Sequence, residues 1–118
     1  MTITLTKQTA RRYVLGRQGL WPGRRWRGKA DLLPALTAIE AVQEDPLHIG
    51  ARSHDFVLHS RIIDYAPEHL RELLYVDRAA LEYGGALFIY PMSELPYWRT
   101  PMSRRGVERR FAAMLEKD

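Results

Sequence analysis

The sequence predicts an α+β domain that is mostly helical and carries one small β-hairpin. With 118 residues, the chain has the length of a single compact domain. Hydrophobic residues make up 46% of it and recur at helical spacing in several segments, most of which begin at a good capping residue. A Gly-Gly pair between two extended runs predicts the hairpin.

The first helix is expected from Thr6 to Gln18, with Thr6 as its N-cap and Gly19 as the glycine that ends it. Its apolar stripe consists of Ala10, Tyr13 and Val14. The Pro- and Gly-rich segment 20–28 is expected to be a loop.

Two tryptophans alternate with arginines in this loop. Tryptophan and arginine together suit stacking on bases and contacts to phosphates. For Trp21 we favour the other interpretation, in which Leu20 and Trp21 pack on the core; for Trp26 both remain open.

Three further helices are expected. Asp31 caps the second, which buries Leu32, Leu36 and Ile39 and ends near Glu40. Asp45-Pro46 is a typical helix start, so the third is expected over 47–62, with Leu47, Ala51, His54, Leu58 and Ile62 on one face. Pro67 opens the fourth, with Leu70, Leu73 and Leu74 inward.

The remainder of the chain is expected to form a hairpin over 81–90, turning at Gly84-Gly85, a short turn or single helical turn over 93–98 and a last helix over 103–117. Three helices followed by a hairpin is the element order of a winged helix-turn-helix. We therefore expect a winged-helix domain over 1–98 and a basic C-terminal helix over 99–118.

The charges are segregated along the chain. Residues 1–30 carry eight basic side chains and no acidic one, 31–98 carry four basic and eleven acidic, and 99–118 carry six basic and three acidic. Such basic ends indicate a surface that faces a polyanion, and arginine suits bidentate phosphate contacts. A solvated basic helix face is the alternative.

Several classes of function are excluded or disfavoured. With Cys 0, there is no disulfide, thiol nucleophile or Cys-ligated metal. The four histidines form no metal-binding pair, so neither a metal nor a cofactor is expected. No apolar run reaches the roughly 18 residues of a membrane span, and no signal peptide is recognised, so a cytoplasmic location is expected.

Particular residues add a resemblance to a known family. The sequence resembles the N-terminal part of the winged-helix DNA glycosylases, the YcaQ-like or AlkZ-like proteins, which repair alkylated and crosslinked bases. The order and spacing of the following pieces carry it: Ala10-Arg11-Arg12, Gln18-Gly19-Leu20, Val42-Gln43-Glu44-Asp45-Pro46, Ala51-Arg52-Ser53-His54, Leu58-His59-Ser60-Arg61-Ile62, Leu81-Glu82-Tyr83 and Leu95-Pro96.

The resemblance implies duplex DNA as partner and metal-free hydrolysis of the N-glycosidic bond of alkylated purines. It places the family's catalytic signature on Gln43 and Asp45. The middle residue of that signature is usually apolar and is here Glu44, while Gly84 and Ala86 stand where the family has Trp and His. The expected DNA contacts are Arg11, Arg12, Arg24, Arg25, Arg27, Arg52 and His54.

The chemistry of the two signature residues can be argued independently. An N7-alkylated purine is already a cationic leaving group, so the enzyme must chiefly position water and stabilise an oxocarbenium-like sugar, which a carboxylate such as Asp45 can do. In an extended segment Gln43 projects on the same side. The alternative is that Asp45 only caps the helix expected after Pro46, and that Gln43 is a solvated linker residue.

Two other functions remain open. One is a binding module without catalysis, either a truncated relative or a small regulator. The other is a protein-interaction domain that uses exposed Met92, Tyr97 and Trp98. The oligomeric state is not predicted.

Overall fold

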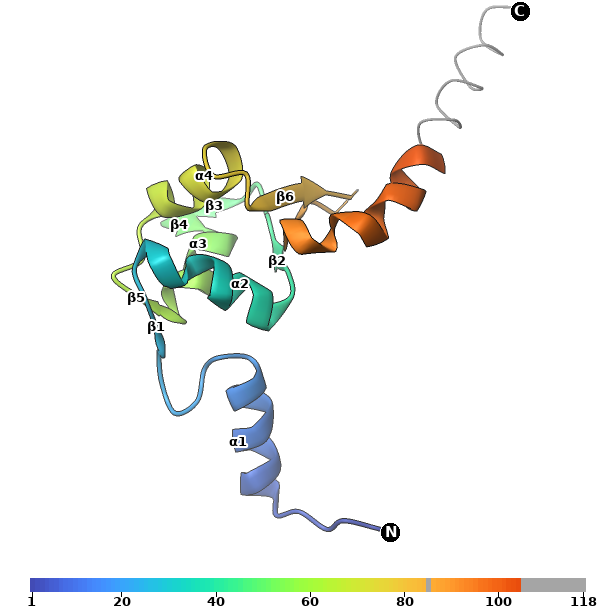
Figure 1. The fold of residues 1–118 in the computed structure, drawn as a ribbon. Helices are drawn as coiled ribbons and strands as arrows, with labels where there is room; N and C mark the ends of the chain where they lie inside the picture. Colours follow the sequence, from blue (N-terminus) through green and yellow to red (C-terminus); the bar gives the residue numbers. More distant parts are fainter. Residues whose placement is uncertain (85, 105–118) are drawn as a thin grey trace, which may run out of the picture.

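The computed structural model describes residues 1–84 and 86–104, and it confirms the α+β class (Figure 1). Its α-helices are α1 (Lys7–Arg17), α2 (Leu32–Ile39), α3 (Ser53–His59) and α4 (Pro67–Tyr75), followed by helical residues 95–104. Two short 3₁₀ turns, η1 (Lys29–Asp31) and η2 (Met92–Glu94), precede α2 and the last helical segment. None of the helices in these ranges is long and apolar enough to cross a membrane.

The main sheet has three antiparallel strands in the order β2-β7-β6. Strand β6 (Ala80–Tyr83) and strand β7 (Phe88–Pro91) form the hairpin expected from the sequence, and β2 (Val42–Gln43) pairs with β7. Two small ladders complete the strands: β1 (Trp26–Arg27) lies parallel to β5 (Ile62–Ile63), and β3 (His48–Ile49) lies antiparallel to β4 (Ala51–Arg52).

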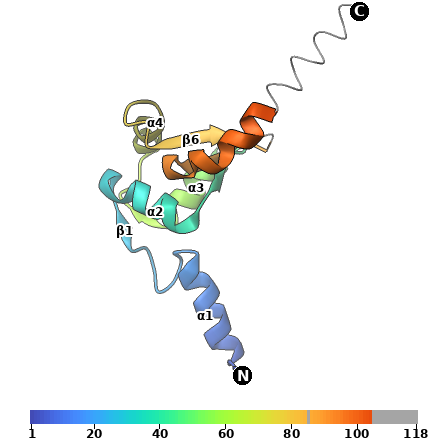
Figure 2. The ribbon, with the colours of Figure 1, turned by 45° about the vertical axis from the view of Figure 1, so that its right-hand side comes forward.

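The core lies between α2, α3, α4 and the main sheet. Its fully buried side chains are Leu32, Leu36, Leu58, Ile62 and Ile89. The inward positions expected on the second and fourth helices are confirmed, because Leu32 and Leu36 on α2 and Leu70, Leu73 and Leu74 on α4 are all buried. Figures 1 and 2 show these helices gathered beside the sheet, with α1 standing apart from them.

Helix α1 has the ends that the sequence predicts. The backbone N–H of Thr9 donates to the Thr6 hydroxyl at 3.1 Å, and Gly19 follows the helix with a φ of +73°. The apolar stripe of the helix, however, covers no core. Tyr13 is 67% exposed and Val14 58%, and no residue of α1 is buried.

The expected helix over 47–62 is wrong at both ends, because α3 covers only Ser53–His59 and Ile62 lies in strand β5. Residues 48–52 form the β3-β4 ladder, which turns at Gly50, where φ is +79°, and α3 begins only at Ser53. One cause is local: a carboxylate oxygen of Asp45 accepts the backbone N–H of Leu47 at 2.8 Å, a turn that competes with helix initiation. His54 and Leu58 are buried on α3 as expected, and Ile62 is buried in β5 instead of on the helix, whereas Leu47 is 67% exposed.

A continuous helical segment begins at residue 95, inside the turn expected over 93–98 and before the last helix expected from 103. Most of the helix expected over 103–117 lies outside the described residues, and the division at 98/99 stays a prediction. Trp98 packs on the hairpin, with its ring centroid 4.8 Å from that of Tyr90 and 5.4 Å from that of Tyr83. Of the three residues expected to be exposed, only Tyr97 is fully so, at 75%.

The backbone at Gly19, between α1 and the body of the domain (α2, α3, α4 and the main sheet), requires a glycine. A Cβ atom built there would lie 2.4 Å from a ring carbon of Trp26, and φ is in the left-handed region. We expect Gly19→Ala to lower the free energy of unfolding by about 2–3 kcal/mol, from backbone strain and overpacking together. Gly23→Ala is the matched control, because no atom lies within 4 Å of its added Cβ. Urea unfolding checks this; equal effects of the two substitutions would contradict it.

Candidate active site

Strand β2 and the residues after it separate the three signature side chains between two cavities. Gln43 and Asp45 line one groove of about 320 Å³, which also contains Gln18, Ser53 and Arg61. Glu44 lines a different cavity of about 340 Å³. Alternation of successive side chains along an extended backbone accounts for this division. The structure therefore brings the two predicted catalytic residues together.

Gln43 is fixed by the main sheet. Its backbone pairs with Phe88 of β7, and its side-chain amide donates to the carbonyl oxygen of Ala86 at 3.4 Å. The side chain is exposed toward solvent. Its amide oxygen has no hydrogen-bond partner among residues 1–84 and 86–104, so it can accept a hydrogen bond from a water molecule in the groove.

Asp45 is half-buried and held from one side. One carboxylate oxygen accepts the Leu47 backbone N–H at 2.8 Å, and the other makes no hydrogen bond or ion pair within the described part of the chain. No helix begins at Pro46, so the alternative in which Asp45 is only a helix N-cap is wrong. The carboxylate is left with an unused oxygen in a groove lined by polar side chains.

Glu44, the charged residue at a position that is usually apolar in the family, has a partner. Its carboxylate lies 3.7 Å from the guanidinium of Arg52, and the Glu44 side chain is only 23% exposed. Because this pair lies in the second cavity, the charge of Glu44 stays out of the groove of Gln43 and Asp45.

His54 and its neighbours form the inner wall of that second cavity. His54 is 5% exposed, its Nε2 atom lies 3.8 Å from Asp55, and its Nδ1 atom has no partner among the described residues. The Tyr65 hydroxyl donates to Asp55 at 2.6 Å, and burial together with this contact raises the pKa of Tyr65 far above its ordinary value. The burial of His54 agrees with its place on the apolar face of the expected helix, and the DNA contact expected for it from the resemblance would require a buried side chain to reach DNA.

Arg61 also lines the groove, and its hydrogen bonds to two backbone carbonyls were not predicted from the sequence. It is 9% exposed and donates to three oxygens: the Gln18 carbonyl at 2.8 Å, the Val57 carbonyl at 2.8 Å and the Ser60 hydroxyl at 2.9 Å. Burial lowers the pKa of its guanidinium.

A carboxylate partner for Arg61, such as Asp64 or Glu82, is a natural expectation, but it is wrong. Asp64 pairs with Arg27, and Glu82 accepts from the Tyr75 hydroxyl. The Gln18 carbonyl lies at the C-cap of α1, and the Val57 carbonyl lies in the last turn of α3. The partial negative charge at the C-terminal end of a helix favours a cation such as Arg61 there. The signal in the sequence was weak, because a helix-end contact to a distant carbonyl has no fixed spacing.

A third hollow, the basic cleft, has a volume of about 310 Å³ and lies beside α1. It is lined by Arg12, Tyr13, Gly16, Arg17 and Arg25. The Arg12 guanidinium lies 5.1 Å from the ring centroid of Trp21, and that of Arg25 lies 4.4 Å from the ring centroid of Trp26. These stacking contacts orient the two guanidinium planes while leaving their N–H donors free for an anion.

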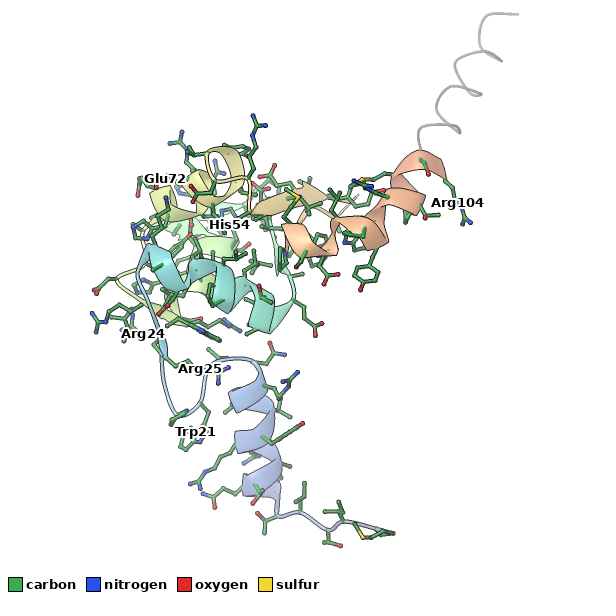
Figure 3. The ribbon with its side chains drawn as sticks, viewed as in Figure 1. Trp21, Arg24, Arg25, His54, Glu72 and Arg104 are labelled. Atoms are coloured by element: carbon green, nitrogen blue, oxygen red, sulfur yellow. The ribbon has the colours of Figure 1, made fainter. Side chains whose placement is uncertain are left out.

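The core packing expected for Leu20 and Trp21 is wrong: Leu20 is 37% exposed and Trp21 42%, and the Trp21 ring lies beside the Arg12 guanidinium. For Trp26, where both interpretations were open, the ring packs against the core. Figure 3 shows Trp21, Arg24 and Arg25 on the loop between α1 and the body, with His54 among the helices beyond it.

The predicted DNA contacts thus fall into distinct environments. Arg11, Arg12 and Arg25 are exposed on α1 and the loop. Arg24 donates to the His59 carbonyl at 3.5 Å, Arg27 is paired with Asp64 at 2.5 Å, and Arg52 is paired with Glu44. In residues 1–84 and 86–104 no group of three His, Asp or Glu side chains could hold a metal ion.

Comparison with known proteins identifies the family. The family model of the AlkZ-like DNA glycosylases matches residues 36–117, a range that contains β2, Gln43, Asp45 and the whole main sheet. No curated protein and no solved structure gives a significant match. Because the family model covers more than half of the sequence, the chain belongs to the AlkZ-like DNA glycosylase family.

Proposed function

We propose that this chain is a winged-helix domain that binds duplex DNA and hydrolyses the N-glycosidic bond of alkylated purines. Family membership supports DNA repair as the setting. The element order α2, β2, α3, α4, β6, β7 and the sheet order β2-β7-β6 support the winged-helix topology, in which three helices precede a hairpin. The proposal calls for no metal or cofactor and agrees with the cytoplasmic location expected from the sequence.

The observation that carries the proposal is the shared groove of Gln43 and Asp45. In the reaction, the bond between the sugar C1′ atom and the purine nitrogen breaks, and the leaving purine takes both electrons, which neutralises its positive charge. Water then bonds to C1′ and gives up a proton to the Asp45 carboxylate. Gln43 orients this water through its amide, and the negative charge of Asp45 stabilises the oxocarbenium-like sugar.

The path of DNA is proposed along α1 and the loop. The basic cleft contains Gly16 and Arg17, and the catalytic groove contains Gln18, so the two sites adjoin at the end of α1. Helix α4, the third helix of the winged-helix order, exposes Glu68, and its Glu72 is paired with Lys29. Its acidic side chains disfavour insertion into a groove of DNA.

The experiment uses a labelled duplex with one N7-methylguanine, divided between a native gel and an alkali-treated denaturing gel. We expect both a mobility shift and a cleaved strand. A shift without cleavage would contradict catalysis and favour the binding module. Neither shift nor cleavage, together with a mass that rises with protein concentration, would favour the protein-interaction domain, which the exposed stripe of α1 and exposed Tyr97 could serve.

The salt dependence of binding tests the basic cleft. We expect the double substitution Arg12→Ala and Arg25→Ala to lower the slope of log affinity against log salt by about 2, since each phosphate contact contributes about 0.9. Arg27→Ala is the comparison and should change the slope less, because Arg27 already neutralises Asp64. Fluorescence anisotropy at several salt concentrations measures the slopes; equal changes would contradict this assignment.

A further inference from the structure

The β3-β4 hairpin exposes large apolar side chains at a point where the fold does not need them. Ile49 is 82% exposed and Leu47 67%, and neither belongs to the core cluster. Phe56 on α3, 54% exposed, lies behind the turn, with its ring 4.0 Å from a Cβ atom built at Gly50. Leu47, just before the hairpin, and Ile49, within it, therefore form an exposed apolar tip.

The position of this tip is set by the proposed catalytic carboxylate. Ile49 follows Asp45 by four residues, so their Cα atoms can lie at most about 14 Å apart. The tip is also anchored at both ends, by the Asp45 contact to the Leu47 N–H and by the Arg52 pair with Glu44.

We propose that Leu47 and Ile49 form a wedge that enters the base stack of duplex DNA beside the damaged nucleotide. Apolar side chains that insert between base steps unstack them, and enzymes that act on a base must first take it out of the stack. The inserted tip fills the space that the displaced base leaves, and the sugar of that nucleotide reaches the groove of Gln43 and Asp45. This inference rests on the proposed function, because it assigns the wedge to the same substrate.

The physical alternative is that this tip packs on another protein surface. DNA is the occupant favoured by the chain itself, because the tip immediately follows the catalytic strand and the family acts on DNA. His48, opposite Arg52 in the ladder, is exposed and provides a polar contact for a flanking phosphate, while Arg52 stays paired with Glu44.

The test uses 2-aminopurine, whose fluorescence rises when it unstacks, placed next to N7-methylguanine in a duplex. Wild type is compared with the double variant Leu47→Ser and Ile49→Ser, and with Val76→Ser as control. Val76 is 73% exposed and lies outside both the groove and the basic cleft. We expect wild type and Val76→Ser to raise the fluorescence, and the double variant to leave it unchanged while base release slows about tenfold or more.

A second substrate separates insertion from other defects. When the lesion lies in an unpaired bulge, its base is already unstacked, so we expect the double variant to recover to within about threefold of wild type. Normal fluorescence and normal release by the double variant would overturn the wedge while leaving the proposed glycosylase intact. A fluorescence rise that depends on the wedge, without base release by wild type, would support insertion and overturn the proposed function instead. Loss of self-association in the double variant, without any effect on DNA, would assign the tip to a protein contact and overturn the wedge.

Discussion

Replacing Asp45 by asparagine is expected to slow the release of N7-methylguanine by about 100-fold or more. Asparagine keeps the size of the side chain and an oxygen that can accept the Leu47 N–H, so the local turn should survive. In the proposed mechanism, the substitution removes the negative charge beside the developing oxocarbenium ion and the group that takes the proton from water. Single-turnover kinetics with excess protein measures the effect on chemistry.

The adjacent carboxylate supplies the matched control. Glu44→Gln removes the same charge one residue earlier, but Glu44 lies in the second cavity beside Arg52. We expect this variant to keep base release within about threefold of wild type, and both variants to keep their duplex affinity. A similar loss of activity in the two variants would contradict the assignment, because it would point to general electrostatics instead of one groove.

Replacing Arg61 by methionine is expected to lower the free energy of unfolding by about 1–3 kcal/mol. The substitution fills a similar volume but removes the donor to the Gln18 carbonyl, whereas the Val57 carbonyl keeps the Ser60 hydroxyl at 2.8 Å. Each buried acceptor left unsatisfied costs about 1–3 kcal/mol. Because the Gln18 carbonyl lies at the end of α1, the loss should also loosen the contact between α1 and the body.

Urea unfolding followed by circular dichroism measures this cost. Arg52→Met is the matched control, since its side chain is 59% exposed and its ion pair with Glu44 is long, at 3.7 Å. We expect it to change stability by about 0.5 kcal/mol or less. A similar small effect of Arg61→Met would show that solvent satisfies the Gln18 carbonyl and that Arg61 is not required for stability.

Much of the fold could be predicted from the sequence because its signals are local. Thr6 and Gly19 bound α1 and Pro67 opens α4, as capping preferences predict, whereas Asp31 precedes α2 without capping it, because its carboxylate accepts the Arg27 backbone N–H at 2.8 Å. The exception is the stretch after Asp45-Pro46, where two tendencies compete. The Asx-type turn at Asp45 and the positive φ of Gly50 favour a tight hairpin, and spacing of apolar residues alone could not distinguish it from a helix.

Within the candidate site, the sequence predicts that Gln43 and Asp45 lie together, but it does not predict the contacts of the residues around them. Gln43 and Asp45 are two residues apart on an extended segment, so their common side follows from backbone geometry. The contact of Arg61 with Gln18 and the ion pair of Arg27 with Asp64 depend on residues far away in sequence. No periodicity encodes such contacts, and only the packed structure reveals them.

A double-mutant cycle on Gln43 and Asp45 tests most directly whether the two residues act together on one water molecule. The rate of N7-methylguanine release is measured for wild type, Gln43→Ala, Asp45→Asn and the double variant, with duplex affinity measured for each. If the two act as a unit, the double variant should be little slower than Asp45→Asn alone. Independent losses that multiply in the double variant would contradict a shared catalytic groove. Base release that survives in all three variants would contradict it as well.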